Sequence, residues 1–225
     1  VRHRYSTLAG MLNTKIFDPT NSKSVRNIYL KNSRRRVVVS GEFFDHDAVV
    51  VDKEGSCTQV LVDWFDEIDQ FHRKKGVDLT QFQHHLYMMP QPKACDSYGG
   101  MNVGHRSAVF RCSEGLIAHE LGHSLGLGHA EIPRTEGMTA SRARYGDWSD
   151  FMGLLYYRLN APHAVFMGWV PESEVLQIKR PGRYSLRALY GRGRGYRALR
   201  FSSGSRFDYF LSYRFHEGTF DLFHR

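Results

Sequence analysis

The clearest hydrophobic periodicity in the first part of the chain runs from Thr58 to Arg73. Its apolar side chains recur at steps of three and four residues, as the buried face of a helix requires. They are Val60, Leu61, Trp64, Phe65, Ile68 and Phe71. The pattern predicts a helix over Thr58–Arg73, which Gly76 ends.

Shorter apolar runs predict strands on either side of this helix. Val37–Val39 and Ala48–Val51 are rich in valine, which favours short strands. His84–Met89 lies before a proline and predicts a buried strand, and Ser107–Phe110 predicts another. The glycine-rich run Tyr98–Gly104 between these two is expected to be a loop.

Two neighbouring histidines, His84 and His85, open the third of these strands. Neither has a partner at the spacing of metal ligands, so both are interpreted as ordinary strand residues.

The hydrophobic pattern changes after Pro181, where short runs alternate between apolar and polar residues. Tyr184–Leu189, Tyr196–Phe201 and Phe207–Phe215 predict an antiparallel β unit. We therefore divide the chain into a domain over residues 1–180 and a β-rich segment over residues 181–225. Gly191–Gly195, with its two arginines, predicts a hairpin turn in preference to an RNA-binding segment.

Both ends of the sequence suggest a piece of a longer protein. The chain begins at Val1 without an initiator methionine or a signal-like apolar stretch. Its terminal strand is expected to be followed by more sheet. No apolar run approaches the roughly 20 residues that span a bilayer.

Composition narrows the class of protein. Hydrophobic residues make up 41% of 225, which argues against general disorder. Lys and Arg number 31 against 23 Asp and Glu, so the net charge of +8 favours acidic glycans, other anionic polymers or membrane headgroups as partners. The triple arginine Arg34–Arg36 is interpreted as a solvated flank.

Three cysteines, Cys57, Cys95 and Cys112, lack the paired spacing of a thiolate zinc site. Cys95 and Cys112 bracket a loop that one disulfide could close, which would suit an oxidising compartment. The sequence does not choose among the three possible pairings.

The segment with the most chemical information runs from His119 to His129. Ser113 is placed to cap a helix over this segment, on which His119 and His123 leave the same face one turn apart. Gly126 allows a sharp turn at the helix end, and His129 then returns as a third nitrogen ligand. Three imidazoles leave one position of a tetrahedral zinc ion open, as in catalytic sites.

Glu120 lies beside these ligands and is expected to act as the general base on a zinc-activated water. Further along, Tyr145–Gly153 is expected to form a tight turn that contains Met152. Asp147 either orients a ligand histidine or caps this turn. His163 either contacts substrate or is an ordinary satisfied histidine.

The long zinc motif resembles that of the metzincin clan of zinc peptidases. Tyr145–Gly153 follows it at the distance where metzincins place their Met-turn, a tight turn that sets a methionine, here Met152, beneath the histidines. Within this clan, Ala130 after the third histidine, Tyr145–Gly153, Asn160–His163 with Gly168–Trp169, and Leu211–Arg214 are most similar to the gametolysin family. The resemblance covers roughly residues 77–214, whereas residues 1–56 match no known pattern. It implies an α+β fold, with a mixed twisted sheet, an active-site helix and a Met-turn.

The same resemblance implies a secreted zinc endopeptidase that is made as a precursor and cleaves proteins or glycoproteins of an extracellular matrix or cell wall. We further expect Ser107–Phe110 to pair with an extended substrate backbone. No nucleic acid partner is expected. The alternative function is that of an inactive homologue that binds glycans or other polyanions through its basic residues.

Overall fold

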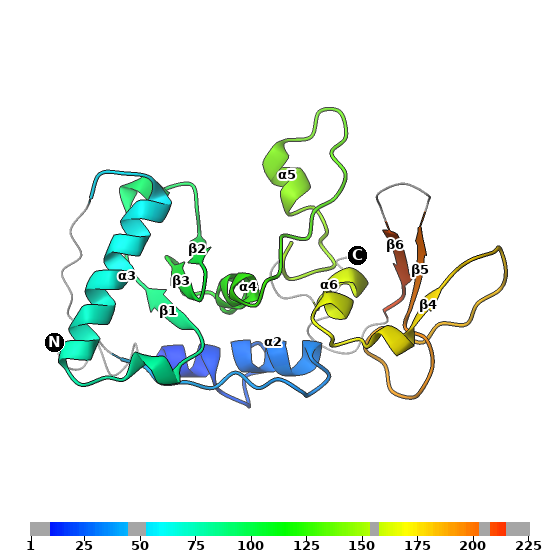
Figure 1. Ribbon diagram of the computed structural model, residues 1–225, viewed down its shortest axis with the longest axis horizontal. Helices are drawn as coiled ribbons and strands as arrows, with labels where there is room; N and C mark the ends of the chain where they lie inside the picture. Colours follow the sequence, from blue (N-terminus) through cyan, green and yellow to red (C-terminus); the bar gives the residue numbers. More distant parts are fainter. Residues whose placement is uncertain (1–9, 45–52, 154–157, 203–207, 215–225) are drawn as a thin grey trace. The chain divides into compact units, whose positions relative to one another are not determined.

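The computed structural model describes residues 10–44, 53–153, 158–202 and 208–214. The chain forms two compact units, and each is described by itself (Figure 1). The first contains residues 1–26 and 39–128, and the second contains residues 27–38 and 129–225. Helices and strands both occur in these ranges, which confirms the α+β class.

No helix within the described ranges is long and apolar enough to cross a membrane.

The first unit consists of a three-stranded sheet with helices on both of its faces. Its described elements are a helical stretch over residues 10–16, α3 (Cys57–Lys74), η1 (Leu79–Gln81), β1 (His85–Met88), η2 (Lys93–Cys95), β2 (Gly100–Val103), β3 (Arg106–Val109) and α4 (Glu114–Ser124). The strand order is β1-β3-β2, in which β1 runs parallel and β2 antiparallel to β3.

Helix α3 confirms the predicted helix in the first unit. The Ser56 side chain accepts from the backbone N–H of Gln59 at its start, and Gly76, with a φ of 82°, follows its end. Its apolar face packs on the sheet, where the rings of Phe65 and Tyr87 stack with centroids 4.3 Å apart. A buried cluster thus joins the helix to β1 and β3. It consists of Cys57, Val60, Leu61, Trp64, Phe65, Tyr87, Met89, Cys95 and Ala108.

The alternation of side chains along β3 places the sheet between α3 and α4 (Figure 1). Ala108 is fully buried in the cluster formed with α3. Its neighbour Ser107 points to the other face, where its hydroxyl donates to the backbone carbonyl of Glu120 in α4 at 3.3 Å. The sheet therefore supports the helix that carries the histidines.

The predicted glycine-rich loop was wrong in part, because Gly100–Val103 forms strand β2. Gly100 pairs with Val109, and a Cβ atom at Gly100 would lie 2.8 Å from both the Ala108 carbonyl oxygen and Glu120 Oε1. Glycine is required there by close packing against α4. A sequence pattern does not reveal that requirement.

The disulfide joins Cys57 to Cys95, and Cys112 is a free thiol. Of the three pairings that the sequence left open, the structure therefore has Cys57–Cys95, and the bridge considered between Cys95 and Cys112 does not form. Cys57 begins α3 and Cys95 ends η2, so their pairing depends on how the helix lies against the sheet. Both cysteines are part of the buried cluster.

The second unit contains short helices and a second three-stranded sheet. Its described elements are α2 (Val25–Asn32), which belongs to this unit from Asn27 onward, α5 (Ala140–Arg144), α6 (Ala161–Phe166), η3 (Glu172–Glu174), β4 (Val175–Gln177), β5 (Ala198–Ser202) and β6 (Asp208–Ser212). The strand order is β4-β5-β6, in which β4 is parallel and β6 antiparallel to β5.

This sheet differs from the predicted one in its first strand. The predicted strand over Tyr184–Leu189 does not form. Its backbone donates two separate hydrogen bonds, from Arg187 N to Tyr196 O and from Leu189 N to Tyr213 O, and these do not make a continuous strand pairing. β4 pairs with β5 instead, so one sheet contains residues from both sides of the expected boundary at residue 181. The strands predicted around β5 and β6 are confirmed.

Two further strand predictions fall in the first fifty residues. Val37–Val39 has no regular structure, so that prediction was wrong. Residues 45–52 are not described, and the strand predicted over Ala48–Val51 lies entirely outside the described residues.

Candidate metal centre

Helix α4 carries two of the predicted ligands and the predicted base. The Ser113 hydroxyl accepts from Leu116 N at its start, as expected of an N-cap. The helix ends at Ser124, and Gly126 follows with a φ of 91°, a conformation that glycine adopts without strain. The chain therefore turns sharply where the sequence predicted it.

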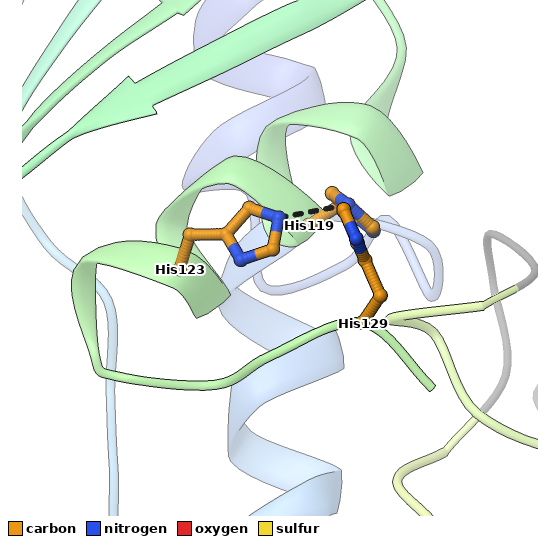
Figure 2. Close-up of side chains that lie close together, drawn as sticks. All are labelled: His119, His123 and His129. Carbon is orange, nitrogen blue, oxygen red and sulfur yellow. Dashed lines mark hydrogen bonds between the residues drawn. The ribbon is translucent and has the colours of Figure 1, made fainter. Parts of the chain in front are cut away.

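His119 and His123 project from the same side of α4, one turn apart (Figure 2). Their Nε2 atoms lie 3.2 Å apart. Two nitrogens bound tetrahedrally to zinc at about 2.0–2.1 Å would be separated by about 3.3 Å. The helix thus holds the two imidazoles at the spacing of neighbouring ligands.

The orientation of the His123 ring is fixed by the turn after the helix. Its Nδ1 lies 2.8 Å from the carbonyl oxygen of Leu127, which is an acceptor only. Nδ1 therefore carries the proton and donates it, so the neutral ring has its lone pair on Nε2. This is the bond by which metal-ligating histidines are commonly oriented.

His129 completes the group three residues after Gly126. One ring nitrogen from each of His119, His123 and His129 lies within 4.8 Å of the other two (Figure 2). The ring of His129 also packs against Tyr145, with centroids 4.3 Å apart. These three residues lie close enough together to hold one metal ion.

Glu120 is almost completely buried, with 5% of its surface exposed. Burial raises the pKa of its carboxyl to about 8. Its carboxylate lies against the Gly100 backbone, and no hydrogen bond or ion pair joins it to the described part of the chain. It is thus the buried carboxylate next to the first histidine, as the sequence predicted.

The segment Tyr145–Gly153 forms a compact turn that is bonded to the residue after His129. Ala130 N donates to Met152 O at 3.2 Å, and Asp147 N donates to Ala130 O at 3.0 Å. Met152 itself is fully buried. The backbone of the turn therefore holds the chain directly after the third histidine.

The hydrogen bonds of Asp147 are those of a turn cap. Its Oδ1 accepts from the backbone N–H and the hydroxyl of Ser149, at 2.9 and 2.5 Å. Its Oδ2 accepts from the Asn160 side chain at 2.8 Å. Of the two roles considered for Asp147, this geometry favours capping over the orientation of a histidine.

Asp150 is a residue of this turn that sequence reasoning missed. It is fully buried, and its carboxylate accepts from Met152 N, Asn160 N and His163 Nδ1, at 2.7, 2.7 and 2.8 Å. The signal was present in the acidic residue two positions before Met152. His163 is therefore a satisfied histidine, bonded to a buried carboxylate.

Comparison with known proteins found no match to this chain among protein-family profiles, curated proteins or solved structures.

Proposed function

We propose that this protein is a zinc-dependent endopeptidase of the metzincin type, similar to gametolysin. The proposal is carried by one observation, the clustering of His119, His123 and His129 nitrogens next to a buried carboxylate, Glu120. A helix with unrelated surface histidines would have no reason to bury a glutamate between two of them.

The ligand set fits zinc. Three neutral imidazoles suit a tetrahedral ion with one open position, and the 3.2 Å between the two Nε2 atoms agrees with its bond lengths. When bound there, zinc would polarise a scissile carbonyl and lower the pKa of a water molecule to about 7. His119, His123 and His129 would hold it.

Glu120 is proposed to move the proton. One carboxylate oxygen would take a proton from the attacking water as its oxygen bonds to the carbonyl carbon. The same oxygen would then give that proton to the amide nitrogen as the C–N bond breaks. Burial beside the sheet confines the carboxylate to the neighbourhood of the histidines.

The structure changes which strand is proposed to bind the substrate. β3 is the central strand and has a partner on both sides, so the expected pairing of substrate with Ser107–Phe110 is wrong. β2 (Gly100–Val103) has one strand partner within the described residues. We propose that the outer edge of β2 pairs with an extended peptide.

The natural substrate is proposed to be a protein or glycoprotein outside the cell. The Cys57–Cys95 disulfide suits a protein of an oxidising compartment. Secretion and a matrix or cell-wall substrate are otherwise implications of the gametolysin resemblance.

The test is proteolysis of an unfolded protein such as reduced casein, with zinc content measured in parallel. Wild type should bind one zinc per chain and cleave, and a chelator should abolish cleavage until zinc is restored. Glu120→Gln should keep the zinc and lose activity by about 100-fold or more. The exposed Glu136 provides the matched control, because Glu136→Gln should cleave like wild type.

Three results would contradict parts of the proposal. Wild type that binds no zinc would remove the metal centre, and zinc-loaded protein that cleaves no protein substrate would favour the alternative, an inactive homologue. Cleavage by Glu120→Gln at the wild-type rate would remove the assigned base.

A further inference from the structure

A basic hollow of about 670 Å³ lies within the second unit, on the segment that leads from β4 to β5. Five of its lining residues define it here as the arginine hollow: Arg187, Arg192, Arg194, Tyr196 and Tyr213. The volume is in the range of binding sites for small molecules or short segments of a polymer.

Acidic residues compensate the charge of this region only in part, as far as the described residues show. From Val175 to Ser202 the chain has eight basic residues and no Asp or Glu; they are Lys179, Arg180, Arg183, Arg187, Arg192, Arg194, Arg197 and Arg200. Arg197 pairs with Glu174 and Arg200 with Asp208. Among the described residues, the three arginines of the hollow form no ion pair.

A buried arginine fixes the backbone of the hollow. Arg197 is fully buried, and its guanidinium donates to Ala188 O at 2.8 Å and to Gly193 O at 2.7 Å. Glu174 accepts from its Nε at 2.5 Å and also pairs with Arg34 at 2.7 Å, so two guanidinium groups share one carboxylate. The two sides of the glycine-arginine turn are therefore held together by a buried side chain.

The Arg187 side chain is fixed in turn by the glycines of the loop. Its Nε donates to Arg194 O at 2.6 Å. A Cβ atom at Gly193 would lie 3.4 Å from its guanidinium carbon, so the guanidinium packs against bare backbone. Because one of its five donors is used to hold it, the remaining donors are oriented for a ligand.

Exposed aromatic side chains continue from the hollow along β6. Tyr209 and Leu211 lie on one face of this strand and Tyr213 follows its end; the three side chains are 48%, 56% and 50% exposed. Tyr209 also stacks on Phe201 of β5, with ring centroids 5.3 Å apart. A row of this kind offers flat apolar surface beside the arginines.

We propose that the arginine hollow binds an anionic polysaccharide, with its carboxylate or sulfate groups on Arg187, Arg192 and Arg194 and its sugar rings on Tyr196 and Tyr213. Guanidinium groups bind both kinds of anion through paired hydrogen bonds. RNA-binding Arg-Gly segments are disordered, whereas this turn is pinned by Arg197. The disulfide also favours a compartment where acidic glycans are the available polyanions.

Binding is measured with polygalacturonate, dextran sulfate and neutral dextran, in the presence of chelator and at several salt concentrations. The full chain should bind one or both anionic polymers and should not bind neutral dextran. Arg192→Gln/Arg194→Gln should weaken binding by about tenfold or more and flatten its dependence on salt. Tyr196→Ser should weaken binding without changing the salt dependence.

The matched control is Arg142→Gln/Arg144→Gln, which removes two exposed arginines from α5 of the same unit. It should bind within about twofold of wild type. An equal loss in this control, or no loss in Arg192→Gln/Arg194→Gln, would show general charge attraction and overturn the site. Tighter binding of a single-stranded RNA oligonucleotide that depends on the same arginines would overturn the polysaccharide assignment.

The proposal does not depend on the peptidase function. Glu120→Gln should bind the polysaccharide as wild type does. Loss of cleavage with retained binding, or the reverse, therefore separates the two proposals.

Discussion

His123 donates through Nδ1 to the carbonyl oxygen of Leu127, only four residues later in the chain. Gly126 lies between these two residues, and its positive φ turns the backbone back towards the helix. The same turn thus sets the tautomer of the second histidine and directs the chain to the third. The metal centre depends on this local geometry as much as on the histidines themselves.

Gly126→Ala is therefore expected to damage the centre. A side chain at a φ of 91° costs about 1–2 kcal/mol, so the free energy of unfolding should fall by that amount and zinc affinity should fall with it. Gly128→Ala is the control, because a Cβ atom there meets open space. Zinc competition and denaturant unfolding measure both effects. Equal behaviour of the two variants would mean that the turn does not position His129.

Asp150→Ala should destabilise the second unit by about 2–5 kcal/mol, because the buried N–H groups of Met152 and Asn160 lose their acceptor. Asp150→Asn keeps one acceptor oxygen and should cost less. Urea unfolding measures the change, with the exposed Glu136→Ala as a control that should stay within about 0.5 kcal/mol. A loss below 1 kcal/mol for Asp150→Ala would contradict this role.

The lowered pKa of the Asp147 carboxyl predicts that the protein loses stability in acid. Burial by itself would raise the pKa of Asp147, but hydrogen bonds from Asn160 and Ser149 outweigh it and hold the pKa below its usual value of 3.8. A lowered folded-state pKa contributes stability that is present above the unfolded pKa, about 3.9, and is lost as the pH falls through the folded value. Unfolding free energies between pH 6 and pH 2 should therefore fall below about pH 4.

Asp147→Asn is expected to remove the part of the stability loss in acid that is due to Asp147. The variant should be less stable than wild type at pH 6 and should show a shallower decline in acid. Glu136→Gln serves as the control and should follow the wild-type curve. Identical curves for wild type and Asp147→Asn would show that the carboxylate adds no pH-dependent stability.

Removing the disulfide should cost about 3–4 kcal/mol, as expected for a bridge that closes a separation of 38 residues. The Cys57→Ala/Cys95→Ala variant tests this by denaturant unfolding. Cys112→Ala should change stability much less, because Cys112 is a free thiol. A peptide map that links Cys95 to Cys112 would contradict the observed pairing.

The candidate metal centre was predictable from the sequence because its geometry is local. The spacing of His119 and His123 follows from the helical repeat, and Gly126 marks the turn that brings His129 back. The cap at Ser113 and the helix over Cys57–Lys74 follow from the same short-range rules. In each case the residues that specify the structure lie within a few positions of one another.

What only the tertiary structure decided depends on segments that are far apart in the chain. The Cys57–Cys95 pairing, the strand at Gly100–Val103 and the pairing of β4 with β5 each require two elements to meet. Hydrophobic periodicity specifies which face of an element is buried, but it carries no record of which neighbour covers that face. The arginine hollow also depends on the tertiary structure. Buried Arg197 supports it only when the fold brings Glu174, Ala188 and Gly193 around its guanidinium group.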